Sequence, residues 1–211
     1  MRRLAILFVL LLWAAEAMAG VRLSGGADIS SAYLWRGERV CGLHVYPELA
    51  LTAGNFTFMA YGYFPFDGSY AEKDVEASYR INDFSVHLAC YFVSMPEEKK
   101  QLMEAALCWS PSALPLRMCW FTFFYGDHSS YLQTELYHRF GRFGTLSGNL
   151  GLSVFKGPYT GYREDVDLVH CEIRYSKDFE LGRLTVPLSC GYLFKPYSRA
   201  HFVNLSAGLR F

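Results

Sequence analysis

The final segment of the chain alternates between apolar and small or polar side chains. Its apolar positions are Val203, Leu205, Ala207, Leu209 and the terminal Phe211. A repeat of two residues places these side chains on one face of a β-strand and their neighbours on the other. The pattern therefore predicts a strand with one apolar face that ends the chain on an aromatic residue.

The same repeat continues through most of the chain and is divided by tight turns. Gly54-Asn55 and Asn82-Asp83 each separate two alternating segments, and these residue types suit two-residue hairpin turns. Alternation predicts strands at 23–33, 45–51, 56–62, 75–81, 84–90, 100–109, 116–125, 130–140, 145–155, 165–175, 184–192 and 201–211. The chain is thus expected to be all-β, with about twelve antiparallel strands.

The predicted connections differ in length at the two ends of the strands. Those assigned to the periplasmic end are 54–55, 82–83, 110–115, 141–144 and 176–183. Those at the other end are mostly longer, at 35–43, 64–73, 94–99, 126–129, 156–164 and 193–200. Short periplasmic turns and an even strand number are typical of outer-membrane barrels. Pro47 and Pro187 fall within predicted strands and are expected to be bulged or locally unpaired, which leaves the strand count open by two.

The fold class expected from this pattern is a closed antiparallel transmembrane β-barrel. Strands can cross a bilayer only when every backbone group is paired, which requires closure. A soluble periplasmic β-barrel, with its apolar face turned inward around a lipid-like ligand, would show the same alternation. Charges of both signs on the polar face favour the membrane form. Aromatic residues near strand ends are then expected to form interfacial girdles; they are Tyr33, Trp35, Trp109, Tyr175, Tyr192 and Phe211.

The N-terminus predicts export from the cytoplasm. Arg2 and Arg3 precede the apolar run 4–15, and Ala17-Met18-Ala19 has the pattern of a signal-peptidase site. The apolar run is too short to be a convincing membrane anchor. We predict a cleaved signal peptide at 1–19 and a single barrel domain at 20–211, located in the bacterial outer membrane.

Composition narrows the classes of function. With 20 basic and 20 acidic residues, the chain offers no electrostatic footprint for nucleic acid. No spacing of ligand residues indicates a cofactor or a metal. His128 beside Ser129 and Ser130 is the best candidate for a catalytic pair, but adjacent residues of a strand point to opposite faces. No catalytic residue and no enzymatic activity is therefore predicted.

The polar face of the predicted strands carries acids and bases in nearly equal number. These candidate lumen and selectivity residues are Asp28, Glu48, Asp74, Glu76, Arg80, His87, Glu104, Arg117, Glu135, Arg139, His170, Glu172, Arg174 and Arg210. Two interpretations stay open. Opposite charges on facing walls could pair into a structural network that fills the lumen. Alternatively, they could line a constricted pore and set its selectivity.

Trp35 and Arg36 are expected at the rim of the barrel, where the first strand gives way to its loop. In one interpretation the Arg36 stem passes along the membrane interface while Gly37 permits the turn. In the other, Arg36 provides a positive rim that recruits an anionic solute or a lipopolysaccharide phosphate.

The six cysteines are unusual for a barrel exported through an oxidising compartment. Cys90, Cys171 and Cys190 fall on the predicted apolar face, where they act as small hydrophobes. Cys108 and Cys119 flank the 110–115 turn, and a register that pairs Ser110 with Arg117 places them opposite each other. The sequence leaves open whether these two are bridged or free.

One segment resembles a known family. Residues 28–37, Asp-Ile-Ser-Ser-Ala-Tyr-Leu-Trp-Arg-Gly, resemble the opening of a family of uncharacterised bacterial outer-membrane β-barrel proteins whose first strand follows S-x-Y-x-[FW]-R-G. The stretch 74–79 is similar to that family's acidic strand, and 184–211 resembles its last hairpin. The resemblance implies a barrel in the outer membrane and supplies no substrate and no catalytic residues.

The sequence therefore predicts an outer-membrane β-barrel that acts either as a narrow channel for small solutes or as a structural component of the envelope. The expected partners are outer-membrane lipid, the barrel-assembly machinery and a small solute. Phe211 is expected to be the membrane-insertion signal.

Overall fold

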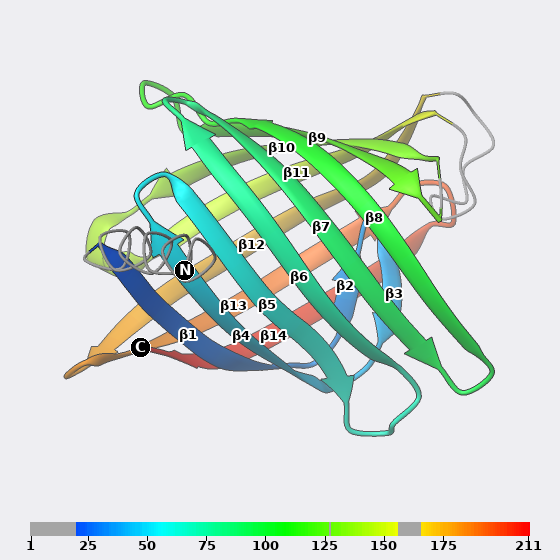
Figure 1. Cartoon of the computed structure of the whole chain (residues 1–211), viewed down its shortest axis with the longest axis horizontal. Helices are drawn as coiled ribbons and strands as arrows, with labels where there is room; N and C mark the ends of the chain where they lie inside the picture. Colours follow the sequence, from blue (N-terminus) through cyan, green and yellow to red (C-terminus); the bar gives the residue numbers. More distant parts are fainter. Residues whose placement is uncertain (1–19, 127, 156–165) are drawn as a thin grey trace, which may run out of the picture.

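Twelve antiparallel strands close into a single barrel in the computed structural model (Figure 1), which describes residues 20–126, 128–155 and 166–211. The predicted signal peptide and the whole of the predicted 156–164 loop lie outside the described residues. The barrel strands are β1 (Val21–Ser30), β4 (His44–Ala53), β5 (Phe56–Pro65), β6 (Ala71–Ile81), β7 (Phe84–Met95), β8 (Glu98–Trp109), β9 (Leu116–Tyr125), β10 (Ser130–Arg139), β11 (Thr145–Phe155), β12 (Asp167–Leu181), β13 (Leu184–Lys195) and β14 (Ala200–Arg210).

The ends of the chain close the barrel. Strand β1 pairs with β14 from Gly26 opposite Arg210 to Ser30 opposite Ser206, and with β4 along its whole length. A short 3-10 helix, η1 (Gly141–Phe143), lies between β10 and β11. No helix in the described part of the chain is long and apolar enough to cross a membrane. The predicted fold class and strand count are confirmed.

The apolar face of the strands points outward. Leu88, Leu205 and Ile173 are each more than half exposed, whereas Asp74 and Glu104 on the opposite face are almost fully buried. A continuous apolar exterior needs a hydrocarbon environment, because water would have to cover it at a large free-energy cost. The soluble barrel with an inward apolar face is therefore wrong, and the chain is a membrane barrel.

Two details of the predicted strands change. The connection predicted at 176–183 is a two-residue turn at Gly182-Arg183, because β12 keeps its alternation to Leu181 and Gly182 adopts a positive φ of 67°. Pro47 and Pro187 lie within continuous strands without a register shift. Each pairs on one side only, since the ladders with β5 and β14 skip these positions. The expectation of local unpairing is confirmed, without a bulge.

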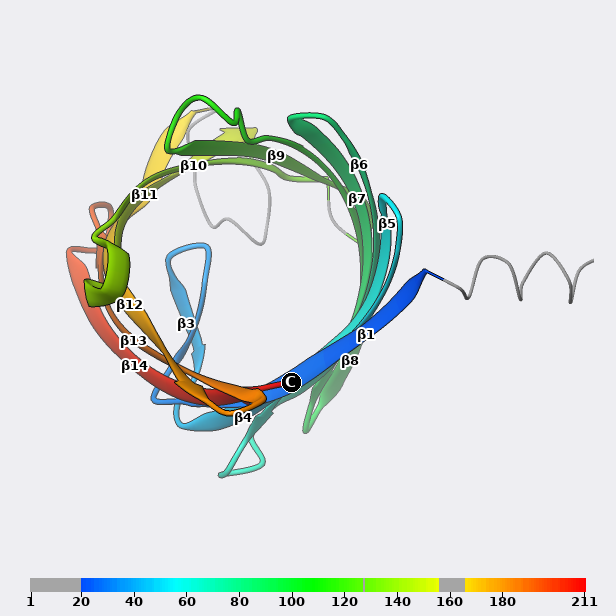
Figure 2. The same ribbon diagram turned by 90° about the vertical axis from the view of Figure 1, so that its left-hand side faces the viewer.

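The connection between β1 and β4 holds the largest departure from the prediction. Instead of an outer loop at 35–43, it forms a second sheet of two short strands, β2 (Tyr33–Trp35) and β3 (Glu38–Cys41). Figure 2 shows this hairpin inside the ring of barrel strands. We refer to residues 33–41 as the lumen hairpin.

Candidate functional site in the barrel lumen

A two-residue turn forms the tip of the lumen hairpin. Arg36 and Gly37 have φ of 47° and 80°, so both lie in the left-handed region that tight hairpin turns require. A side chain at Gly37 would approach Val169 Cγ1 of β12 to 3.1 Å. The tip thus packs against β12, which lies three strands from β1 around the barrel.

Arg36 is buried at this tip, with a side chain only 8% exposed. Its Nη2 donates a hydrogen bond to Glu104 of β8, and Glu104 also accepts one from the Tyr91 hydroxyl at 2.9 Å. The guanidinium carbon lies 4.7–5.1 Å from the centres of four aromatic rings, those of Trp35, Phe121, Phe123 and Tyr131. The predicted position of Trp35 and Arg36 at the rim is therefore wrong, because a buried carboxylate and a ring of π-faces stabilise the cation inside the lumen.

The base of the lumen hairpin is held by aromatic stacking. The ring of Tyr33 stacks on Tyr63 of β5 with centres 3.7 Å apart and planes 8° from parallel. Burial raises the pKa of the Tyr33 hydroxyl well above its usual value, so this group stays protonated. Tyr33 and Trp35 thus belong to the lumen and not to the predicted interfacial girdle. Their rings pack against Tyr63 of β5 and Phe123 of β9 instead of against lipid.

A third contact ties the lumen hairpin to β13. Lys195 at the end of β13 pairs with Glu38, which begins β3. Together with Tyr33 and Arg36, this pair fixes the hairpin to β5, β8 and β13. The lumen hairpin is therefore anchored at its base and at its tip.

The register places the other predicted lumen residues on the inner face of the strands, away from the exposed apolar face. Several pair in separate groups: Arg210 with both Asp28 and Glu48, His87 with Glu76, and Arg174 with Glu172. His170 faces the Tyr131 hydroxyl at 3.4 Å. A continuous network that fills the lumen does not form among the described residues. The role of these residues in selectivity stays a prediction.

Other charged lumen residues have no ion-pair partner in the part of the chain that the structure describes. They are Asp74, Arg80, Arg117, Glu135 and Arg139. Both carboxylate oxygens of Asp74 are buried without a hydrogen bond, and so is Nη1 of Arg36. Pairing is therefore complete in only part of the lumen.

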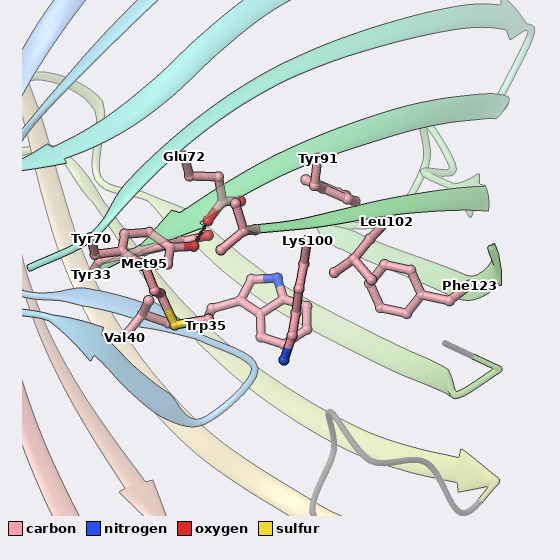
Figure 3. Close-up of a pocket in the computed structure, with 11 residues that line it drawn as sticks. Tyr33, Trp35, Val40, Tyr70, Glu72, Tyr91, Met95, Lys100, Leu102 and Phe123 are labelled. Atoms are coloured by element: carbon pink, nitrogen blue, oxygen red, sulfur yellow. Dashed lines mark hydrogen bonds between the residues drawn. The ribbon is translucent and has the colours of Figure 1, made fainter. Parts of the chain in front are cut away.

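Three cavities follow one another along the lumen face of β7. The first, of about 420 Å³, includes Ser85 and His87 near the end with the short turns. The second, of about 240 Å³, shares His87 and extends through Ala89 to Tyr91. The third, of about 150 Å³, includes Tyr91 and Met95 beside the lumen hairpin, and Figure 3 shows Trp35, Tyr33 and Tyr70 around it. The Arg36–Glu104 pair lies at the junction of the second and third.

A disulfide crosses β8 and β9 beside the second cavity. Cys108 and Cys119 are directly opposite each other in the register and are bonded. Nη2 of Arg117 lies 3.7 Å from the sulfur of Cys108. The bridged alternative left open by the sequence is the one the structure contains, while Cys41, Cys90, Cys171 and Cys190 are free.

The lumen hairpin and the partners of Arg36 were not predicted from the sequence. A signal was present, since Arg36-Gly37 separates two short segments rich in apolar residues in the way that a hairpin turn does. Glu104 and the rings of Phe121, Phe123 and Tyr131 lie far from Arg36 in the chain. No local pattern could have linked them.

Comparison with known proteins supports the same fold. No family model and no curated protein sequence matches the chain. Solved structures of similar fold include KdgM porin, with 12% identity and a TM-score of 0.54, over 89% of this chain and 98% of that one. A second is KdgM porin in complex with disordered oligogalacturonate, with 10% identity and a TM-score of 0.54, over 90% of this chain and 97% of that one. A third is the COG4313 outer membrane channel from Pseudomonas putida F1, with 10% identity and a TM-score of 0.51, over 90% of this chain and 94% of that one.

At such low identity the likeness establishes the fold alone. A closed twelve-strand barrel with an apolar exterior and this architecture is an outer-membrane β-barrel.

Proposed function

We propose that this protein is a narrow channel for small solutes whose lumen is constricted by the lumen hairpin. The succession of three cavities along β7, interrupted where Arg36 meets Glu104, is the observation that carries the proposal. A barrel that served only as a scaffold would have no need of separate cavities along its axis. Charged side chains around a narrow passage would then select among solutes.

Single-channel conductance in planar bilayers tests this proposal. Deleting 33–41 removes the hairpin, and the four residues that stay between Ser30 and His44 can still close the turn because these two are already paired. We expect small openings from the wild-type barrel and several-fold larger ones from the deletion variant. Arg39→Ala is the matched control, since it removes a positive charge from the same hairpin without touching the Arg36 contacts.

Folding must be checked in parallel by heat-modifiable migration in detergent gels. If both the wild-type and the deletion variant are folded but electrically silent, the channel proposal is wrong. The structural role in the envelope would then be the better interpretation, because the paired charge groups on the wall would serve only to hold the barrel together.

We further propose that outer-membrane lipid surrounds the barrel and that the barrel-assembly machinery recognises its last strand. Phe211 supports this, because the residue is 62% exposed while its backbone bonds to Gly25 and completes the seam of the barrel. Deleting Phe211 should lower the yield of heat-modifiable barrel in cells. An unchanged yield would remove Phe211 as the insertion signal.

A further inference from the structure

The cavity of about 420 Å³ near the short turns has an unusual lining. Its walls come from β1, β4, β5, β6, β7 and β9 and from the turn segments between them. Every lining residue except Gly54 can form hydrogen bonds through its side chain, and none is a carboxylate; they are Arg22, Thr52, Gly54, Asn55, Thr57, Ser78, Arg80, Ser85, His87, Ser110 and Arg117. We call this space the arginine chamber.

The three arginines of the chamber differ in their ion pairing from three other arginines of the lumen. Arg36, Arg174 and Arg210 each pair with at least one carboxylate. Arg22, Arg80 and Arg117 form no ion pair within the described residues, and all three side chains are exposed to the chamber. Three guanidiniums facing one polar space repel one another unless an anion lies between them.

Two acids on the strands around the chamber do not supply that anion. Glu76 bonds to Nδ1 of His87 at 2.8 Å and lines the neighbouring cavity instead. Glu135 is opposite Arg117 in the register of β9 and β10, but the two form no ion pair and Glu135 does not line the chamber. Neither acid neutralises the positive charge of the chamber, so this charge can be compensated by an anionic solute.

We propose that the arginine chamber binds small solutes that carry a carboxylate or phosphate group. Guanidinium groups suit these oxyanions because their planar fork donates two parallel hydrogen bonds. The hydroxyls of Thr52, Thr57 and Ser78 provide further donors, and the chamber volume lies in the usual range of roughly 300–1,000 Å³ for small-molecule sites. The binding does not require conduction, whereas its effect on ion selectivity rests on the channel function proposed above.

Titration of inorganic phosphate into the purified barrel in detergent, followed by calorimetry, tests the binding. We expect saturable binding by the wild type that weakens about tenfold for each of Arg22→Gln, Arg80→Gln and Arg117→Gln, as the loss of one charged hydrogen-bonding group predicts. Arg183→Gln is the matched control, because Arg183 lies in a turn at the same end of the barrel and does not line the chamber. Glucose should not bind detectably.

Reversal potentials in a salt gradient provide the second readout. The wild-type channel should prefer anions, and the triple variant should lose that preference while its conductance persists. Phosphate binding that is absent from the wild type, or equal in the folded triple variant, would overturn the chamber proposal. A silent barrel that still binds phosphate would overturn only the channel function.

Discussion

Arg36 is the residue on which the constriction depends. Its guanidinium is removed from bulk water and compensated by one carboxylate, that of Glu104, and by surrounding rings. Removing one member of such a buried pair leaves an uncompensated charge, which typically costs about 3–5 kcal/mol. The hairpin can escape this cost by leaving the lumen, so the pair controls a local equilibrium as well as stability.

Glu104→Gln should therefore release the hairpin tip without unfolding the barrel. We expect trypsin to cut after Arg36 or Arg39 about tenfold faster or more in this variant, because the segment is protected only while it is docked. Mass spectrometry of the early fragments measures the rate. Glu135→Gln is the control, since it neutralises a lumen carboxylate that forms no ion pair with any residue the structure describes. Equal cleavage of the two variants would show that the pair does not hold the tip.

The cross-strand disulfide allows a simple chemical count. Alkylation of the denatured, non-reduced protein should modify four thiols, and alkylation after reduction should modify all six. Replacing Cys108 and Cys119 with Ser should destabilise the barrel by about 3 kcal/mol or less, as loop-closure entropy predicts for a short loop. Cys90→Ser, on the outer face, should leave the midpoint of heat modification unchanged. Six reactive thiols before reduction would contradict the bridge.

The lumen hairpin is an element that its neighbours stabilise. Only three residues of β2 pair with β3, and an isolated two-stranded hairpin is marginally stable in water. Contacts with β5, β8, β12 and β13 supply the missing stability. The hairpin should therefore respond to changes at its tip as one unit.

Gly37→Ala tests that dependence at the level of the element. The new methyl group would occupy a backbone of positive φ and approach Val169 Cγ1 to 3.1 Å, so both strain and crowding oppose docking. We expect larger or noisier channel openings and faster trypsin cleavage within 33–41. Gly42→Ala should behave as the wild type, because its methyl group would meet only the flexible end of Arg39 at 3.5 Å. Identical behaviour of the two variants would mean that the tip does not need its fit against β12.

The barrel elements were predictable because each strand carries its own evidence. Alternation fixes which residues share a face, and Gly54-Asn55 or Asn82-Asp83 marks a turn from local conformational preference alone. The lumen hairpin was not predictable in the same way. A connection of this length is compatible with an outer loop. Its inward position is stabilised by contacts with Glu104, Tyr63 and Lys195, which are distant in sequence. The unpaired arginines of the chamber likewise became visible only when six strands were brought together.

At the scale of the whole molecule, the strands of the barrel point one set of side chains toward lipid and the other set toward the lumen. On the strands, the exposed apolar residues face lipid and the charged residues of the lumen face the axis, and the direction of each follows from its position in a repeat of two. Alternation alone could not say which face was outside. The exposed apolar exterior of the closed barrel answers that question. A charged side chain should therefore be tolerated at a position that faces the lumen and be destabilising at the next position along the strand, which faces lipid.

Adjacent residues of β7 provide the sharpest test of this division. Leu88 is 54% exposed on the outer face, whereas His87 faces the lumen between two cavities and bonds to Glu76. Leu88→Arg should destabilise the barrel by about 2–4 kcal/mol, since it places a cation in hydrocarbon at membrane depth. His87→Arg adds the same group one residue away, where water and a carboxylate receive it, so its folded yield should stay close to that of the wild type. Heat-modifiable migration after refolding into lipid vesicles compares the two, and a lower yield for His87→Arg than for Leu88→Arg would reverse the assignment of inside and outside.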